Sequence, residues 1–165
     1  VLAACLLELP VNERALIIED TSELPCPNLA STRLLVRQDP RDVLKAIPLQ
    51  DLVRQALRMR PNRIIMGEVR GPEAKDLLMA FATGHEGSLG TLHAQSAQEA
   101  LLRLEMLIQL GAPQWSVSAL RRLILLAVSH IVVVKRSHAG QRNLEGIYRL
   151  TSVEDFGFLT EKVTP

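Results

Sequence analysis

The sequence predicts one α/β domain built on a largely parallel β-sheet. A wholly apolar run at residues 15–18 and the run at 63–66, which is apolar after Arg63, are typical of strands that are buried on both faces of a sheet. Segments with apolar residues at helical spacing separate and follow these runs. Strands and helices that alternate in this way form parallel sheets, because each helix returns the chain to the starting edge of the sheet. A chain of 165 residues has room for one such domain.

The elements expected in the first half are a helix at 1–9, a strand at 15–18, an irregular segment at 21–48 with an edge strand at 34–36, a helix from 49 and a strand at 63–66. Pro10 ends the first helix and Pro61 ends the second, because proline and the residue before it disfavour a continuing helix. Four prolines between residues 21 and 48 indicate the irregular segment.

The elements expected in the second half are a helix from 72, a strand at 88–93, a helix at 96–111, a helix at 117–128 and strands at 131–134 and 144–153. Gly84 suits the end of the first of these helices, and Gly90 inside the strand marks a place where another backbone or a ligand can come close. Ser96 and Glu99 form a capping box. A turn at Ala139-Gly140 joins the last two strands, which predicts a C-terminal β-hairpin.

The composition narrows the classes of function. Hydrophobic residues make up 47% of the chain, which is ordinary for a globular protein, and no apolar run reaches the roughly 18 residues of a membrane span. Lys and Arg number 19 against 18 for Asp and Glu, so no broad basic field favours nucleic-acid binding. Cys5 and Cys26 do not predict a disulfide framework, which indicates a reducing, cytoplasmic compartment.

Acidic residues and histidines follow the predicted strands. Glu19 and Asp20 end the first strand, Glu68 ends the strand at 63–66, and His93 ends the strand at 88–93. Parallel sheets bind ligands at the carboxyl ends of their strands, so we expect these side chains to converge at one edge. In nucleotide hydrolases a carboxylate in such a place holds Mg²⁺ or orients the attacking water. The simpler alternatives are a solvated acidic turn after residue 18 and a salt bridge between Glu68 and Arg70.

Two histidines, His85 and His93, frame the glycine-rich stretch Gly84-His-Glu-Gly-Ser-Leu-Gly-Thr-Leu-His-Ala. A zinc-protease motif requires a second histidine four positions after the first, but residue 89 is leucine. A single histidine is usually an ordinary surface or core residue. Two that flank glycines beside acidic strand ends favour a phosphate sensor, since an imidazole N–H can donate to a phosphate oxygen.

These stretches together resemble the Asp box, Walker B segment and His box of the type II/type IV secretion ATPase superfamily. The segments Ile17-Ile-Glu-Asp-Thr-Ser-Glu-Leu, Arg63-Ile-Ile-Met-Gly-Glu-Val-Arg-Gly and Thr83-Gly-His-Glu-Gly-Ser-Leu-Gly-Thr-Leu-His-Ala carry the resemblance. They are most similar to the tight-adherence (Flp) pilus assembly and conjugal transfer ATPases. The resemblance extends from residue 1 to about residue 135.

The resemblance implies a RecA-like P-loop NTPase core that assembles as a homo-hexamer and hydrolyses ATP with Mg²⁺. It makes Glu19 the general base or water-orienting residue, with Glu23 a weaker candidate. Glu68 becomes the Walker B carboxylate, which acts on Mg²⁺ through water. His85 and His93 become sensors of the γ-phosphate.

The resemblance also implies arginines that contact phosphates or the neighbouring subunit, for which Arg33, Arg37 and Arg70 are the candidates. It predicts an ATPase that powers protein secretion or pilus assembly. The ATPase is expected to lie in the cytoplasm, peripheral to the inner membrane, on an inner-membrane platform protein, with no nucleic-acid partner.

The phosphate-binding motif G-x-x-x-x-G-K-[ST] does not occur in these 165 residues. We therefore expect residues 1–165 to be the C-terminal part of the ATPase domain, truncated before the P-loop helix, with the Walker A strand and loop and an N-terminal domain upstream. The chain alone should hydrolyse ATP poorly. Two alternatives are a non-catalytic oligomerisation module of the same apparatus and, less favoured, a nucleic-acid translocase using the basic segment 54–63.

Overall fold

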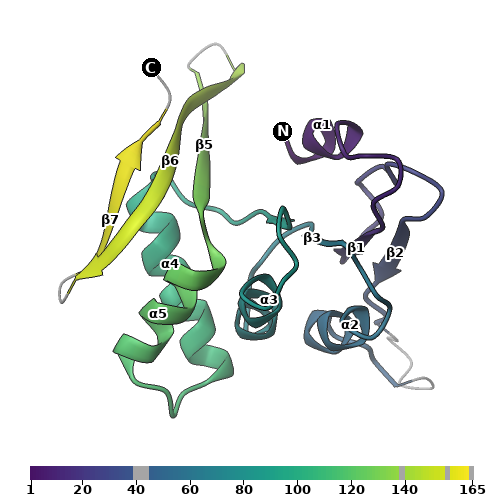
Figure 1. Ribbon diagram of the computed structural model, residues 1–165, viewed down its shortest axis with the longest axis horizontal. Coiled ribbons are helices and arrows are strands. Elements are labelled where there is room, and N and C mark those ends of the chain that lie inside the picture. The colour runs from purple at the N-terminus through teal and green to yellow at the C-terminus, as the bar shows by residue number, and fades with distance from the viewer. Residues whose placement is uncertain (39–44, 138–139, 155–156, 164–165) are drawn as a thin grey trace.

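The computed structural model describes residues 1–38, 45–137, 140–154 and 157–163, and it has a mixed α/β architecture (Figure 1). Its helices are α1 (Leu2–Leu7), α2 (Leu49–Ala56), α3 (Glu73–Phe81), α4 (Ala97–Gly111) and α5 (Val117–Ala127). Its strands are β1 (Ala15–Glu19), β2 (Thr32–Leu35), β3 (Arg63–Met66), β4 (Leu89–Gly90), β5 (His130–Arg136), β6 (Arg142–Glu154) and β7 (Gly157–Lys162).

The first four strands form a parallel sheet in the order β2-β1-β3-β4, as the alternating pattern predicts. Strands β1 and β3 pair from Ala15 with Arg63 to Ile18 with Met66, so their carboxyl ends lie at the same level. The predicted edge strand is β2, one residue longer and two residues earlier than expected. Part of the predicted irregular segment, residues 39–44, lies outside the described residues.

Both faces of this sheet are covered by helices, which explains why β1 is buried along its whole length. Leu16, Ile18, Ile64 and Met66 belong to the main core with α2 and α3, whereas Ile17 and Ile65 share a second cluster with Leu6 of α1. Figure 1 shows α1 on one side of the sheet and α2 and α3 on the other. Alternation of side chains across a strand places them on these two faces.

Helices α4 and α5 connect this sheet to the antiparallel sheet β5-β6-β7. Ser96 caps α4, since the N–H of Glu99 donates to its hydroxyl at 3.2 Å, and Ser116 caps α5 in the same way. At the other end of α4, Gly111 comes close to α3. A side chain there would lie 2.6 Å from the carbonyl oxygen of Pro72. The two helices approach closely because residue 111 has no Cβ.

Two expectations about strands need correction. The predicted strand at 88–93 contains only Leu89 and Gly90, because Gly90 pairs with Met66, where β3 ends, and no strand in the described part of the chain continues beside residues 91–93. Gly90 is also not required by a close approach, since a Cβ there would meet Met66 at an ordinary 3.7 Å. The C-terminal hairpin is part of a larger unit, because β7 adds a third strand to β6. The turn residue Ala139 lies outside the described ranges.

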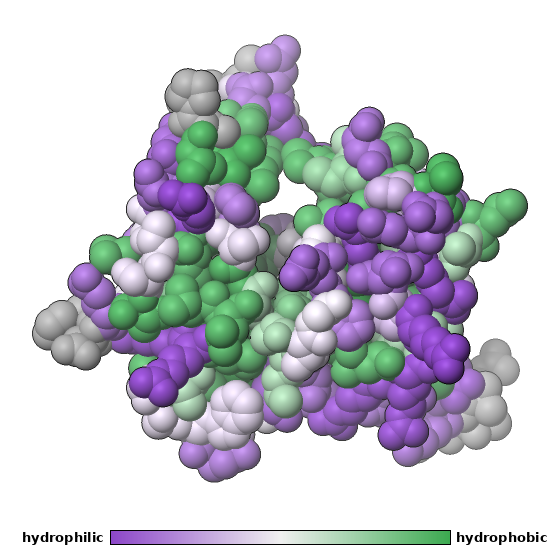
Figure 2. Space-filling model, viewed as in Figure 1, coloured by the Kyte–Doolittle hydropathy of each residue, from purple (hydrophilic) through white to green (hydrophobic). Residues whose placement is uncertain are grey.

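On the face shown in Figure 2, a hollow separates the part formed by α4, α5 and β5 from the parallel sheet. Hydrophobic side chains gather beside it over α5 and β5. The exposed hydrophobic residues of these two elements include Leu126, which is 75% exposed, and Val132. Among the helices that the structure describes, none combines the length and the hydropathy needed to cross a membrane.

Candidate functional site

The strand ends converge on Arg70, which follows β3. Its Nη2 donates to Glu68 Oε2 at 2.7 Å, and its Nη1 lies 3.3 Å from Asp20 Oδ2 at the end of β1. His93, which follows β4, places Nε2 3.3 Å from the second oxygen of Glu68. Residues that follow three adjacent strands therefore form one cluster of acidic and basic side chains, which we call the strand-end cluster: Asp20, Glu68, Arg70 and His93. The salt bridge between Glu68 and Arg70 and the predicted convergence are both present.

Glu68 is held in its ionised form by this arrangement. The hydrogen bond from Arg70 is the main cause that lowers the pKa of the Glu68 carboxyl, and the positive charges of Arg70, His93 and Arg103 lower it further against an opposing effect of burial. The same pairing raises the pKa of Arg70. Arg103 lies on the exposed side of α4, and its position in the sequence gives no signal that separates it from an ordinary surface arginine.

The loop that carries Glu68 and Arg70 is fixed by its neighbours. The N–H of Gly67 donates to Ile18 O at 2.9 Å, the N–H of Val69 donates to Thr91 O at 2.8 Å, and the Thr91 hydroxyl donates to the carbonyl of Gly67. The end of β1 and the segments that follow β3 and β4 are thereby joined at the site edge. These contacts explain how a loop after a short strand can hold two charged residues in place.

Glu19 is buried, with 4% of its surface exposed, and its carboxylate has three donors. Its Oε1 accepts from the N–H of Glu23 at 3.1 Å and of Leu24 at 2.9 Å, and its Oε2 accepts from Arg33 Nε at 3.1 Å. Arg33 also donates to the carbonyl of Leu24. Glu19 thus organises the turn after β1, whereas Glu23, in that turn, is exposed.

The two predicted histidines occupy different surroundings. His93 is 82% exposed beside Glu68, whereas the contact of His85 is with the end of α3. His85 Nδ1 lies 2.9 Å from Ala80 O, and because a carbonyl only accepts, Nδ1 carries the proton. Gly84 and Gly87, on either side of His85, have φ values of +101° and +71°, which favour glycine. A side chain on Gly87 would also collide with the guanidinium of Arg63.

The three candidate arginines also differ in their contacts. Arg33 pairs with Glu19 and Arg70 pairs with two carboxylates of the strand-end cluster. Arg37 is exposed and donates from Nε and Nη2 to the carbonyl oxygen of Lys45 at 3.2 and 2.8 Å. Within the described part of the chain, its partner is a neutral carbonyl, so its positive charge is available to an additional anion.

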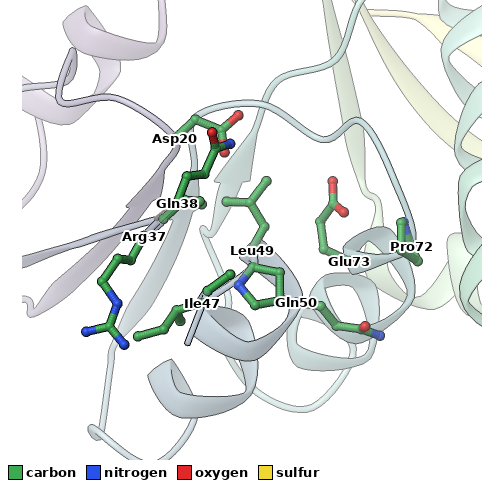
Figure 3. Close-up of a pocket in the computed structure, with 11 residues that line it drawn as sticks. Asp20, Arg37, Gln38, Ile47, Leu49, Gln50, Pro72 and Glu73 are labelled. Atoms are coloured by element: carbon green, nitrogen blue, oxygen red, sulfur yellow. The ribbon is translucent and has the colours of Figure 1, made fainter. Parts of the chain in front are cut away.

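A pocket of about 350 Å³ lies next to the strand-end cluster, between the segment after β2 and the first turns of α2 and α3 (Figure 3). Asp20 and Glu73 lie on its two sides in Figure 3, with Leu49 between them. Its lining consists of Asp20, Val36, Arg37, Gln38, Ala46, Ile47, Pro48, Leu49, Gln50, Pro72 and Glu73. Sequence reasoning did not single out Glu73.

In the described ranges, no group of three or more acidic, histidine or cysteine side chains could enclose a metal ion. Glu68, partly exposed and ionised, instead offers a single carboxylate. Mg²⁺ bound with a nucleotide takes one or two protein carboxylates and completes its shell with phosphate oxygens and water. The residues present therefore fit a magnesium–nucleotide complex better than a metal ion held by protein alone.

The chain matches the model of the type II/IV secretion system protein family over residues 1–153. It is 40% identical to a putative conjugal transfer protein of Mycobacterium tuberculosis over 153 residues, which are 93% of this chain and 43% of that protein. It is 39% identical to the type IV secretion system protein PtlH of Bordetella pertussis, over 81% of this chain and 40% of the relative. The chain thus spans about two fifths of the length of these relatives.

The structure is similar to the crystal structure of the VirB11 ATPase from the Brucella suis type IV secretion system in complex with sulphate. The TM-score is 0.78 at 30% identity, over 90% of this chain and 43% of that one. The fold is also shared with the pilus retraction motor PilT, with a TM-score of 0.53 at 22% identity, over 82% of this chain and 37% of PilT. From the family match and these relatives, the chain belongs to the type II/IV secretion system protein family, whose members include secretion ATPases.

Proposed function

We propose that this chain contributes the hydrolytic half of an ATPase site in a hexameric motor that powers protein secretion or pilus assembly. The observation that carries the proposal is the strand-end cluster, in which Arg70 joins Glu68 and Asp20 and His93 approaches Glu68. An ionised carboxylate with neighbouring donors, at the carboxyl edge of a parallel sheet, is the chemistry that a magnesium–nucleotide complex requires.

In this proposal Glu68 would hold Mg²⁺ through a water molecule bound to the ion. Mg²⁺ would neutralise charge on the phosphates of ATP and polarise the bond to the leaving group. The lowered pKa of Glu68 keeps the carboxylate ionised at neutral pH, as a contact to a cation requires. His93 is largely exposed beside the same carboxylate, and we propose that it donates to a phosphate oxygen and transmits loss of the γ-phosphate to Glu68. His85 is proposed as a second sensor, through its Nε2.

The geometry favours different roles for the two glutamates after β1. Glu19 was expected as the water-orienting residue, but its carboxylate is buried and bonded to two backbone N–H groups and Arg33. The burial of Glu19 leaves little access for a water molecule to its carboxylate. We propose that Glu19 shapes the turn and that the exposed Glu23 presents the carboxylate that orients the attacking water.

Among the arginines, Arg37 is proposed to reach the phosphates bound by a neighbouring subunit. Its exposed guanidinium bonds a carbonyl, whereas Arg33 and Arg70 are neutralised by carboxylates. An arginine that stabilises charge on the transferred phosphoryl group from another subunit is a common part of nucleotide-hydrolysing assemblies.

The remaining parts of the site are proposed to lie upstream of residue 1, in a segment that carries the Walker A strand and loop. The chain spans 43% of the VirB11 ATPase, and that ATPase was crystallised with sulphate, a tetrahedral anion like the phosphates of ATP. We further propose that residues 1–165 form the C-terminal part of a RecA-like domain, and that the full-length protein acts in the cytoplasm on an inner-membrane platform protein.

The test is steady-state ATP hydrolysis by the full-length protein and by the isolated 165-residue chain, each with and without Mg²⁺. The proposal predicts Mg²⁺-dependent turnover by the full-length protein and none above background by the isolated chain. A full-length protein that binds its secretion partners but hydrolyses no nucleotide would show the alternative function, an interaction module without catalysis. Turnover by the isolated chain would contradict the proposal that an upstream segment is needed to bind the phosphates of ATP.

A further inference from the structure

Glu73, in the first turn of α3, is a buried carboxylate that the proposed mechanism does not use. It is 5% exposed, and with Glu19 it makes up the buried polar and charged residues in the described part of the chain. Burial of a carboxylate is costly unless hydrogen bonds compensate for the lost water. The partners of Glu73 therefore indicate what the carboxylate does for the fold or for the site.

Both partners are backbone groups of the loop that carries Glu68 and Arg70. The N–H of Arg70 and the N–H of Gly71 donate to Glu73 Oε1, each at 2.8 Å. Bonds from backbone N–H groups to an ionised carboxylate are stronger than bonds to a neutral acceptor. Glu73 thus fixes the loop at the residue whose side chain bridges Glu68 and Asp20.

These bonds serve the loop as well as the start of α3. A glutamate in the first turn of a helix can accept from N–H groups just before the helix, as in a capping box. The first-turn N–H groups of Ala74 and Lys75 have other partners, since they donate to Gly71 O and Pro72 O, at 3.2 and 3.3 Å. The bonds of Glu73 point backwards, to residues before the helix, and a Cβ on Gly71 would lie 3.0 Å from Glu73 Oε2. The loop and the carboxylate fit closely.

We propose that Glu73 is a positioning residue for nucleotide hydrolysis: its carboxylate holds the Arg70 and Gly71 amides and thereby sets Arg70 against Glu68 and Asp20. The inference rests on the proposed function of this site. Loss of the carboxylate releases two of the amides that fix the loop between β3 and α3. Glu68 and Arg70 then sample other positions, which slows hydrolysis without removing a contact to the nucleotide.

The experiment compares Glu73→Ala, Glu73→Gln and Asp76→Ala in the full-length protein. Asp76 is the matched control, since it is a largely buried carboxylate on the same helix whose partners are Gln50, Arg54 and Lys75. Glu73→Gln keeps an oxygen that can accept from both amides. The readouts are kcat and KM for ATP, and hydrogen exchange of the backbone in a peptide that covers residues 67–72.

We expect Glu73→Ala to lower kcat by roughly tenfold or more with KM changed less than about twofold, and to speed exchange in the 67–72 peptide. Glu73→Gln should recover most of kcat, and Asp76→Ala should leave both readouts near the wild type. An active protein in which Glu73→Ala keeps its kcat, or in which Asp76→Ala loses as much, would overturn the role of Glu73 alone. A wild-type protein without ATPase activity would instead overturn the proposed function on which the inference rests.

Discussion

Arg70 Nη2 donates to Glu68 Oε2 at 2.7 Å, and this bond is the main reason that the pKa of Glu68 lies below its ordinary value. The same guanidinium reaches Asp20 at 3.3 Å, so one arginine connects the ends of β1 and β3. The connection keeps an acidic pair together that would otherwise repel, and it keeps Glu68 ionised where we propose that Mg²⁺ and ATP bind.

Arg70→Ala should change how stability depends on pH. Because the folded pKa of Glu68 is depressed, its contribution is present above the unfolded value of about 4.3 and is lost as pH falls through the folded value. The pair is partly exposed, so solvent screens it and we expect a small effect. Thermal unfolding at about pH 7 should show the variant to be less stable, and the difference should shrink near pH 3. A difference that stays constant with pH would argue against the pairing.

Replacement of His93 tests the proposed phosphate sensor. His93→Ala should lower turnover by roughly tenfold or more while the dissociation constant for ATP stays within a few-fold, because a sensor acts after the nucleotide has bound. His130→Ala is the control, since His130 is an exposed histidine on β5 that contacts Ser129. If His93→Ala changes neither quantity, the residue is an ordinary surface histidine.

Glu19→Gln and Glu23→Gln separate the two roles after β1. Glu19→Gln removes the charge opposite Arg33 and should lower stability by about 1–3 kcal/mol, measured by denaturant unfolding. Glu23→Gln should leave stability nearly unchanged, since Glu23 is exposed, and should reduce turnover by about a hundredfold. A Glu23→Gln protein with normal turnover, beside a stable but inactive Glu19→Gln protein, would return the water-orienting role to Glu19.

Mixed assemblies test whether Arg37 acts on a neighbouring subunit. Arg37→Ala and Glu68→Gln proteins should each hydrolyse ATP slowly, because an arginine of this kind contributes about 10³–10⁵ in kcat. In a mixed assembly, an interface between the two variants can combine the intact Glu68 of an Arg37→Ala subunit with the intact Arg37 of a Glu68→Gln subunit. Mixing should therefore restore part of the turnover. Mixtures that stay as inactive as the separate proteins would place Arg37 outside the neighbouring site.

Gly111→Ala tests the close approach of α4 to α3. The added methyl group would lie 2.6 Å from the Pro72 carbonyl oxygen, which is backbone and cannot move aside easily. We expect a loss of about 1–3 kcal/mol in the free energy of unfolding, despite the higher helix propensity of alanine. Leu110→Ala, at an exposed position on the same helix, should change stability by less than about 1 kcal/mol. Equal stabilities of the Gly111→Ala and wild-type proteins would show that the helices can separate.

Much of the parallel sheet can be predicted from local pattern. The apolar runs that become β1 and β3 are buried on both faces, so their composition marks them, and their shared direction places Glu19, Asp20 and Glu68 at one edge. The length of β4 is not predictable in this way, because it depends on where β3 ends. Strand β7 was missed because its pairing with β6 is antiparallel and its segment has little apolar pattern.

The candidate site also combines features that the sequence pattern predicts with features that it does not. Acidic residues and histidines after strands are visible in the sequence, and their convergence follows from the parallel order. The bond from Arg33 to Glu19 and the burial of Glu19 and Glu73 depend on tertiary packing, whereas the bonds of Glu73 are local, to residues two and three positions before it. Glutamate in the first turn of a helix is common, so the position of Glu73 alone gives no sign that its carboxylate serves the preceding loop.

The most direct test of the hydrolytic role of the strand-end cluster is to measure ATP hydrolysis and ATP binding by the full-length Glu68→Gln protein. The control is Glu86→Gln, which changes an exposed glutamate next to His85. We predict that Glu68→Gln lowers kcat by about 10²–10³ while ATP still binds, and that Glu86→Gln behaves like the wild type. Turnover of the Glu68→Gln protein at the wild-type rate would contradict the account.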